Sequence, residues 1–299
     1  IGSGGQQRPA TLIENVVERT YFDQVATGAQ YPFSPTLRLE LSVQGTRQTS
    51  QLEIDQRLIS GGRQISASRQ RVNGDALNYG QSVLALVGDR SVFGPTSPIR
   101  GTRWRAEIAQ SLGDVNFGTL LLDARHYRWI RPFTLAVRAF HFGRYGRDAE
   151  LRGLPPLLVG QSALVRGYRP ETFTFQECAA AGGPPGSCPV LERLLGSRIA
   201  ATSAELRIPL AGVERFSLLG IGVPPIELAP FVDAGVAWTA QQDPVWRASA
   251  SNATARTPVV GTGVAMRVNL GALIVEGYWA RPLQRDRGGL FGINLAPGW

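Results

Sequence analysis

Few side chains in this 299-residue chain are suited to catalysis. Its only histidines are His126 and His141. No segment matches a zinc-binding HExxH helix, a GxSxG nucleophile elbow or a phosphate-binding glycine loop. A Ser/His/Asp site assembled from separate segments would escape such motifs, and it stays an alternative. The residue types favour a protein that is not an enzyme and that uses no cofactor.

The two cysteines, Cys178 and Cys188, lie close together in a segment rich in glycine and proline. The partner ligands that usually complete a zinc site are absent nearby, so we expect no metal site. A disulfide that closes an exposed loop is the better interpretation, and it implies an oxidising, extracytoplasmic compartment. Two free thiols remain the alternative.

The formal net charge is +8, and all 31 basic residues are arginine. A basic chain raises nucleic-acid binding as a hypothesis. The arginines, however, alternate with apolar residues instead of clustering in a patch. An arginine-lined lumen, or contacts with anionic lipid, explains the same charge. We therefore expect no nucleic-acid partner.

Many of the arginines lie on segments in which apolar and polar residues alternate with period two. Such alternation begins at Leu37 and returns in the segments 103–108, 133–138, 203–210 and 260–269. It places apolar residues on one strand face and polar residues on the other. The most apolar stretch, 216–238, contains Glu227, Asp233 and three prolines, so we reject it as a transmembrane helix. A soluble sandwich fits the alternation too, but the charged polar faces and the aromatics near strand ends favour a transmembrane barrel.

We expect about twelve strands of membrane-spanning length, at 17–31, 36–46, 49–59, 77–93, 101–112, 115–129, 132–143, 198–210, 226–238, 258–270, 271–282 and 288–299. The interruption at 144–197 is too long for a hairpin turn, and long loops of this kind usually carry function. Shorter loops are expected at 60–76 and 239–257. The sequence therefore predicts an all-β, antiparallel transmembrane β-barrel that forms one domain over residues 1–299.

Four segments carry a family resemblance. Residues 164–169, LVRGYR, resemble the VRGF/Y motif of the BamA/TamA-like outer-membrane assembly superfamily, the bacterial surface antigen family. Residues 203–210, SAELRIPL, and 231–238, FVDAGVAW, resemble the two strands that follow that motif. The C-terminal LFGINLAPGW resembles an outer-membrane β-signal through Phe291, Ile293, Leu295 and Trp299, although Pro297 departs from the pattern. The resemblance covers residues 160–299 and is only architectural before them.

The resemblance implies that the long loop folds back into the lumen. Strand parity places Glu205 and Asp233 on the inward face, and the resemblance brings Arg166 to them as a loop anchor. A guanidinium suits that role because it stays charged and offers a rigid donor fork to carboxylates. Gly167 would allow a tight turn, and Tyr168 would pack against the barrel wall. In the alternative, Arg166 is solvated outside the barrel and the two acids line a wet lumen.

Family barrels have sixteen strands and follow periplasmic modules. We therefore expect that the first strands and any such module are missing from this chain, that the barrel is smaller, or that another chain completes it. An imperfectly closed seam between the first and last strands would offer an edge to which a client strand could add.

The resemblance implies a bacterial outer-membrane protein that inserts barrels or passes polypeptides across the membrane. Its partners would be outer-membrane lipids together with client polypeptides or periplasmic proteins. A passive diffusion channel that favours anions is the alternative, because arginines lie on polar strand faces at positions 38, 103, 105, 138, 207 and 267. A membrane anchor for a missing N-terminal module is the third hypothesis.

Overall fold

The computed structural model describes residues 10–182, 186–221, 224–246, 255–271 and 273–295. Its main feature is one antiparallel sheet of 13 strands. The continuous path through this sheet is formed by β1 (Ala10–Ser34), β2 (Leu37–Ser60), β4 (Leu77–Asp89), β6 (Pro98–Gly113), β7 (Phe117–Ile130), β8 (Phe133–Tyr145), β11 (Arg198–Ala211), β12 (Ile226–Trp238), β13 (Val259–Asn269), β14 (Ile274–Pro282) and β15 (Leu290–Leu295).

The remaining elements lie beside this path. Strand β3 (Arg63–Asn73) pairs with β2, and β5 (Val92–Phe93) pairs with β6. The long loop between β8 and β11 contains a two-stranded sheet, β9 (Leu157–Leu158) with β10 (Leu195–Gly196). It also holds the short helices η1 (Pro170–Thr172), α1 (Phe175–Ala180) and α2 (Pro189–Glu192). No helix in the described part of the chain is both long and apolar enough to cross a membrane.

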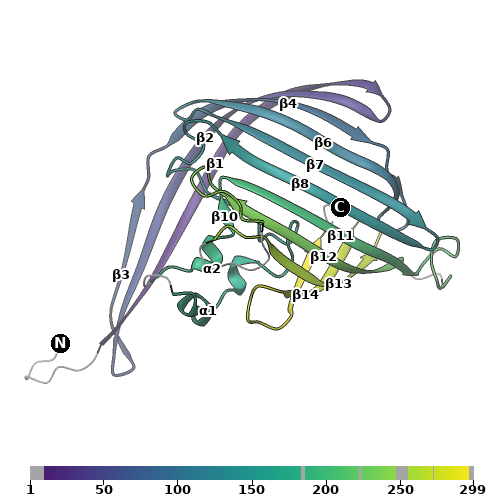
Figure 1. Ribbon diagram of the computed structural model, residues 1–299. Coiled ribbons are helices and arrows are strands. Elements are labelled where there is room, and N and C mark those ends of the chain that lie inside the picture. Colours follow the sequence, from purple (N-terminus) through teal and green to yellow (C-terminus); the bar gives the residue numbers. More distant parts are fainter. Residues whose placement is uncertain (1–9, 183–185, 222–223, 247–254, 272, 296–299) are drawn as a thin grey trace, which may run out of the picture.

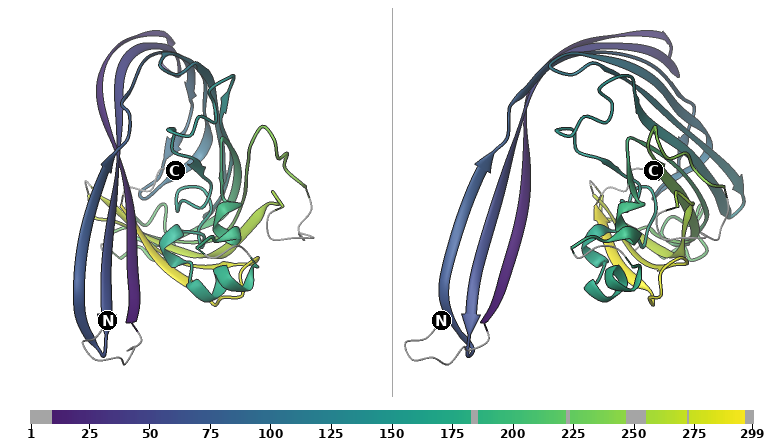
Figure 2. Two further views of the ribbon diagram at one scale, coloured as in Figure 1. Left: turned by 90° about the vertical axis from the view of Figure 1, so that its left-hand side faces the viewer. Right: turned by 60° about the vertical axis from the view of Figure 1, so that its left-hand side comes forward.

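The expected strand boundaries were wrong near the N-terminus. The segments 36–46 and 49–59 form one strand, β2, and the expected loop 60–76 contains β3. The polar run 44–51 does not break β2, because β1 pairs with it on one side while β4 and then β3 pair with it on the other. Gly61 and Gly62, both with positive φ, form the two-residue turn between β2 and β3. Strands β1, β2 and β3 therefore project from the sheet as a long arm (Figure 2).

The sheet is curved (Figures 1 and 2), and its polar side chains line the concave face while its apolar side chains cover the convex face. Exposed apolar side chains run across neighbouring strands of the convex face, among them Leu206, Val232, Val264, Trp279 and Phe291. Their counterparts at the alternate positions point into the concavity, as Glu205, Asp233 and Arg267 do with at most 1% exposure. An apolar exterior around a polar interior is the pattern of a membrane-embedded barrel.

The two ends of the sheet are not joined within the described residues. There, β1 pairs with β2 alone and β15 pairs with β14 alone. Each of these end strands therefore has one edge whose backbone groups form no ladder in the described part of the chain.

The loop between β8 and β11 lies on the concave side of the sheet, where Figure 1 shows α1 and α2. It contributes Val159, Leu164, Val165, Tyr168 and Leu194 to an apolar cluster. The wall completes this cluster with side chains of β11, β12 and β13, namely Ile199, Ala201, Ala237 and Val259. The loop is thus packed into the interior like part of a core, and we call residues 146–197 the plug loop.

Candidate functional site

The motif residues lie at the deepest part of the plug loop. Arg166 is 2% exposed, and Tyr168 is fully buried. Between them Gly167 has a φ of +94°, a left-handed conformation that residues with a side chain rarely adopt. The facing wall also needs a glycine, because a Cβ at Gly261 of β13 would collide with the carbonyl oxygen of Arg166. Both glycines let the two backbones approach closely.

The guanidinium of Arg166 binds both carboxylates that the sequence placed inside the barrel. Its Nε donates to Asp233 Oδ2 at 2.7 Å and its Nη2 donates to Asp233 Oδ1 at 2.9 Å, in a two-pronged contact. The same Nη2 lies 3.0 Å from Glu205 Oε1. The backbone N–H of Arg166 also donates to Asp233 Oδ2, at 3.2 Å. The Phe231 ring lies 3.4 Å beneath the guanidinium carbon, a cation–π contact.

Glu205 is shared among three arginines. Besides Arg166, Arg267 Nη2 donates to Glu205 Oε1 at 2.8 Å and to Oε2 at 2.9 Å. Arg207, two positions along the same strand, donates through Nε to Glu205 Oε2 at 3.1 Å. A fully buried carboxylate is costly unless it is paired and hydrogen-bonded, and Glu205 meets both conditions.

A row of four polar side chains, three of them charged, crosses the strands β12 to β15 next to Glu205. Glu227 of β12, Arg267 of β13, Glu276 of β14 and Asn294 of β15 are successive register partners. Arg267 donates to Glu276 Oε2 at 2.7 Å and to Glu227 Oε1 at 3.0 Å, so the directly opposed side chains have opposite charges. Asn294 links Glu276 to Ser162 of the plug loop.

These contacts define the lumen charge network: Arg166, Arg207, Arg267, Glu205, Glu227, Asp233 and Glu276. Each member is at most 4% exposed. Three guanidiniums meet four carboxylates, which leaves one negative charge in excess. Parity alone could have identified Glu227 and Glu276, because they alternate with apolar residues on strands that the sequence predicted.

A second loop reaches the network from the opposite rim of the barrel. The turn between β4 and β6 brings Ser97, whose Oγ donates to Glu227 Oε2 at 2.7 Å. The Pro98 carbonyl oxygen accepts from Arg207 Nη1 at 2.9 Å. This turn therefore bridges the two walls of the barrel, a contact that the sequence analysis missed because the turn contains no motif.

A second attachment holds the outer part of the plug loop. Arg285, in the turn between β14 and β15, donates to Glu177 through Nε at 2.9 Å and through Nη2 at 3.0 Å. It also donates to the Gly167 carbonyl oxygen at 3.0 Å and lies 3.8 Å from the Phe173 ring centre. Next to it, Gln284 Oε1 accepts from the Tyr168 hydroxyl at 2.6 Å. No sequence signal marked Arg285, because it lies in a turn outside any alternating strand.

Glu177 is the charged partner of this second attachment. Partial burial would raise the pKa of its carboxyl, but hydrogen bonds from Arg285 and from the Thr174 N–H outweigh burial and hold that pKa below its usual range. Glu177 also closes a capping box with Thr174 at the start of α1. In the same segment Cys178 and Cys188 form a disulfide.

The other residues singled out in the sequence lie apart from the network. Phe291, Ile293 and Leu295 project from the convex face of β15 and are 65–80% exposed, while Trp299 lies outside the described residues. His126 and His141 lie on convex-face positions of β7 and β8. Among the described residues, no group of three or more His, Cys, Asp or Glu side chains is arranged to hold a metal ion.

The six arginines proposed to line an anion channel are all on the concave face, and each lies within 3.6 Å of a carboxylate. The shortest ion pairs are Arg38 to Glu40 at 2.7 Å, Arg103 to Asp89 at 3.6 Å, Arg105 to Glu40 at 2.6 Å, Arg138 to Asp123 at 3.0 Å, Arg207 to Glu205 at 3.1 Å and Arg267 to Glu276 at 2.6 Å. Paired guanidiniums attract a passing anion much less than isolated ones.

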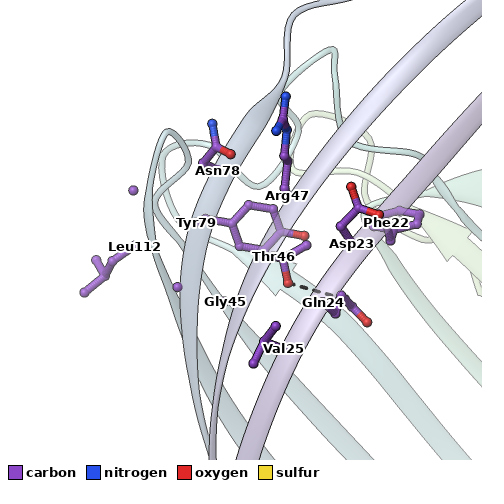
Figure 3. Close-up of a pocket in the computed structure, with 12 residues that line it drawn as sticks. Phe22, Asp23, Gln24, Val25, Gly45, Thr46, Arg47, Asn78, Tyr79 and Leu112 are labelled. Atoms are coloured by element: carbon purple, nitrogen blue, oxygen red, sulfur yellow. Dashed lines mark hydrogen bonds between the residues drawn. The ribbon is translucent and has the colours of Figure 1, made fainter.

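A separate hollow, which shares no residue with the network, lies at the base of the arm. It has a volume of about 920 Å³ and is bounded by β1, β2, β4 and β6. Figure 3 shows Thr46 hydrogen-bonded to Gln24 there, with Arg47 and Asn78 nearby. The opposed glycines Gly45 and Gly80 leave this hollow open, since neither carries a side chain. It brings together no set of convergent charged groups, so we place the functional site at the network.

Comparison with known proteins identifies the fold. The structure is similar to the crystal structure of BamA from Haemophilus ducreyi lacking POTRA domains 1–3, with a TM-score of 0.50 and 10% sequence identity. The match covers 96% of this chain and 61% of the BamA chain. No family model and no curated protein matches the sequence. The fold is therefore a BamA-like barrel, and the predicted antiparallel barrel architecture is confirmed.

Proposed function

We propose that this chain is the barrel of a bacterial outer-membrane protein that assembles or translocates other polypeptides. The observation that carries the proposal is the plug loop, which Arg166 attaches to Asp233 and Glu205 inside a BamA-like barrel. The VRGY motif and the two strands that follow it were the basis of the family resemblance, and they supply these three residues. The apolar convex face supports a membrane location.

In this proposal, the network positions the plug loop and performs no chemistry. Its carboxylates are occupied by arginines, so none is available as a general base. The partners are membrane lipids on the convex face and polypeptide clients at the edge of β15, whose outward side chains Phe291 and Ile293 are strongly exposed. An extended client segment would add to this edge through main-chain hydrogen bonds.

A passive anion channel has less support. The plug loop packs into the interior as an apolar cluster, and the turn that carries Ser97 bridges the barrel from the opposite rim. The six inward arginines that could attract anions are all paired with carboxylates. Bilayer conductance would separate the two functions, because a channel requires a steady anion current through the intact barrel.

The assembly function is tested by reconstitution. The protein is inserted into lipid vesicles, an unfolded eight-stranded outer-membrane barrel is added as the client, and client folding is followed by heat-modifiable gel migration. A cysteine at Ile293 should form a disulfide with cysteines placed in the last strand of the client. Faster folding without cross-links would weaken the proposed edge, and no acceleration would overturn the function.

A further inference from the structure

A second group of arginines lies at the rim from which the plug loop starts. Here the end of β8, the plug-loop segments 149–156 and 192–197, and two residues of the connection between β12 and β13, Thr239 and Arg256, surround a hollow of about 270 Å³. Two cations from distant parts of the chain line it, Arg144 of β8 and Arg256 just before β13. We call this hollow the rim pocket. It shares no residue with the lumen charge network.

Arg144 is buried without a carboxylate partner. Arg144 is only 7% exposed, and its Nη2 donates to the Pro155 carbonyl oxygen at 2.6 Å. Its Nε is buried and has no hydrogen-bond partner within the described residues. Every Asp and Glu of the chain lies in those residues, and none forms an ion pair with Arg144. A buried cation left in this state is costly.

Arg256, which also lines the rim pocket, is half-buried and likewise forms no ion pair in the described part of the chain. Its Nη1 donates to the carbonyl oxygens of Leu195 at 2.7 Å and Glu192 at 2.9 Å. Its Nε donates to the Gln242 side chain at 2.8 Å. All three acceptors are neutral, and burial lowers the pKa of this guanidinium. Both arginines that line the rim pocket therefore hydrogen-bond to neutral acceptors only.

The two acids of the rim pocket are engaged elsewhere. Glu150 Oε1 accepts from the Ser197 hydroxyl and from the Ala240 N–H, both at 2.6 Å. Glu192 Oε1 accepts from the Cys188 N–H at 3.2 Å. The charge of Glu150 acts on both arginines and that of Glu192 acts on Arg256, but neither acid forms a direct ion pair with them. These bonds position the acids at the walls and leave the arginines short of a strong acceptor.

We propose that the rim pocket binds a phosphate group, held between Arg144 and Arg256. A tetrahedral dianion presents acceptor oxygens in several directions, which suits two guanidinium forks that approach from different elements. The bound group would connect the wall strand β8 to the segment before β13, across the base of the plug loop. It is either free inorganic phosphate or the phosphate of a membrane lipid. This inference is independent of the proposed assembly function.

The site is tested by calorimetric titration of the detergent-solubilised full chain with inorganic phosphate, at constant ionic strength. Saturable binding is expected, weakened at least about tenfold by Arg144→Gln or Arg256→Gln, since each removes a charge-assisted contact. Arg144→Lys should weaken it less because the charge remains. The matched control is Arg147→Gln, whose side chain is 80% exposed and paired with Asp148. Heat-modifiable migration shows that each variant is folded.

The source of the phosphate is resolved in nanodiscs. If a lipid supplies it, phosphatidic acid should compete with inorganic phosphate for the wild-type chain, whereas phosphatidylcholine should not. If free phosphate is the ligand, neither lipid should compete. The proposal is overturned if the wild-type chain binds no phosphate in either setting. It is also overturned if Arg144→Gln and Arg256→Gln bind phosphate as tightly as the wild-type chain and the Arg147→Gln control do.

Discussion

The Arg166 attachment should be the most costly single contact to remove from the plug loop. Arg166→Ala deletes the 2.7 Å and 2.9 Å hydrogen bonds to Asp233 and the 3.0 Å ion pair with Glu205. It leaves two guanidiniums facing four buried carboxylates. Removing one partner of a buried ion pair costs about 3–5 kcal/mol. We expect the lower end, about 3 kcal/mol, because Asp233 keeps Ser203 and Glu205 keeps two arginines.

The charge balance of the network predicts that removing a carboxylate destabilises the protein less than removing a guanidinium, and that removing one of each partly restores stability. Asp233→Asn leaves three guanidiniums and three carboxylates, so it should destabilise less than Arg166→Ala. Combining Arg166→Met with Asp233→Asn should recover about 2 kcal/mol relative to the sum of the single changes, since neither charge is left unpaired. The control is Arg169→Ala, which removes a pair with the exposed Glu171 and should change stability by less than about 1 kcal/mol.

The measurement that checks these expected changes is guanidinium chloride unfolding of each variant in vesicles, followed by tryptophan fluorescence. Arg193 is 8% exposed while the plug loop is packed against the barrel wall. Trypsin cleavage after Arg193 therefore reports detachment of the plug loop separately from unfolding of the barrel. Equal effects of Arg166→Ala and Arg169→Ala, together with additive double changes, would refute the proposed anchor.

Three further predictions concern the same loop. Gly261→Val should displace the plug loop, because the valine side chain would occupy the position of the Arg166 carbonyl oxygen. Trypsin sensitivity at Arg193 should therefore rise. The control is Gly277→Val, at an open position, which should leave that sensitivity unchanged. The folded-state pKa of Glu177 is lowered, so its pairing with Arg285 stabilises the folded plug loop fully above the usual pKa of glutamate, and this stabilisation is lost as pH falls through the lower value. Hydrogen exchange of α1 should therefore increase in acid, and Glu177→Gln should remove that pH dependence. Reduction of the Cys178–Cys188 disulfide should cost up to about 3 kcal/mol in the chain-entropy model for so short a loop, with faster exchange confined to α1 and α2; cooperative loss of the whole barrel would contradict this local role.

Strand parity was sufficient to place the inward charges. Glu205 and Asp233 alternate with apolar neighbours, and one face of each strand must be apolar in a membrane barrel, so their direction was fixed by local sequence. The depth of Arg166 was not accessible in this way, because the plug loop has no period. It was predicted only through the resemblance of the motif around it.

The features that sequence reasoning missed depend on contacts between distant segments. Arg285 pairs with Glu177 across 108 positions, and Ser97 reaches Glu227 across 130. The N-terminal arm was missed for a different reason. The segments 36–46 and 49–59 were predicted as separate strands and 60–76 as a loop, although Gly61 and Gly62 could have indicated a hairpin that continues the sheet.

In the proposed function, a plug loop anchored by Arg166 serves a barrel that assembles or translocates polypeptides. The most direct test compares client folding in vesicles that contain the wild-type chain, Arg166→Ala or Arg169→Ala at equal amounts of folded barrel. The wild-type chain and Arg169→Ala should accelerate client folding equally, and Arg166→Ala should lose most of the acceleration. Equal client folding with and without the wild-type chain would contradict the function, and full activity of Arg166→Ala would contradict the role of the anchor.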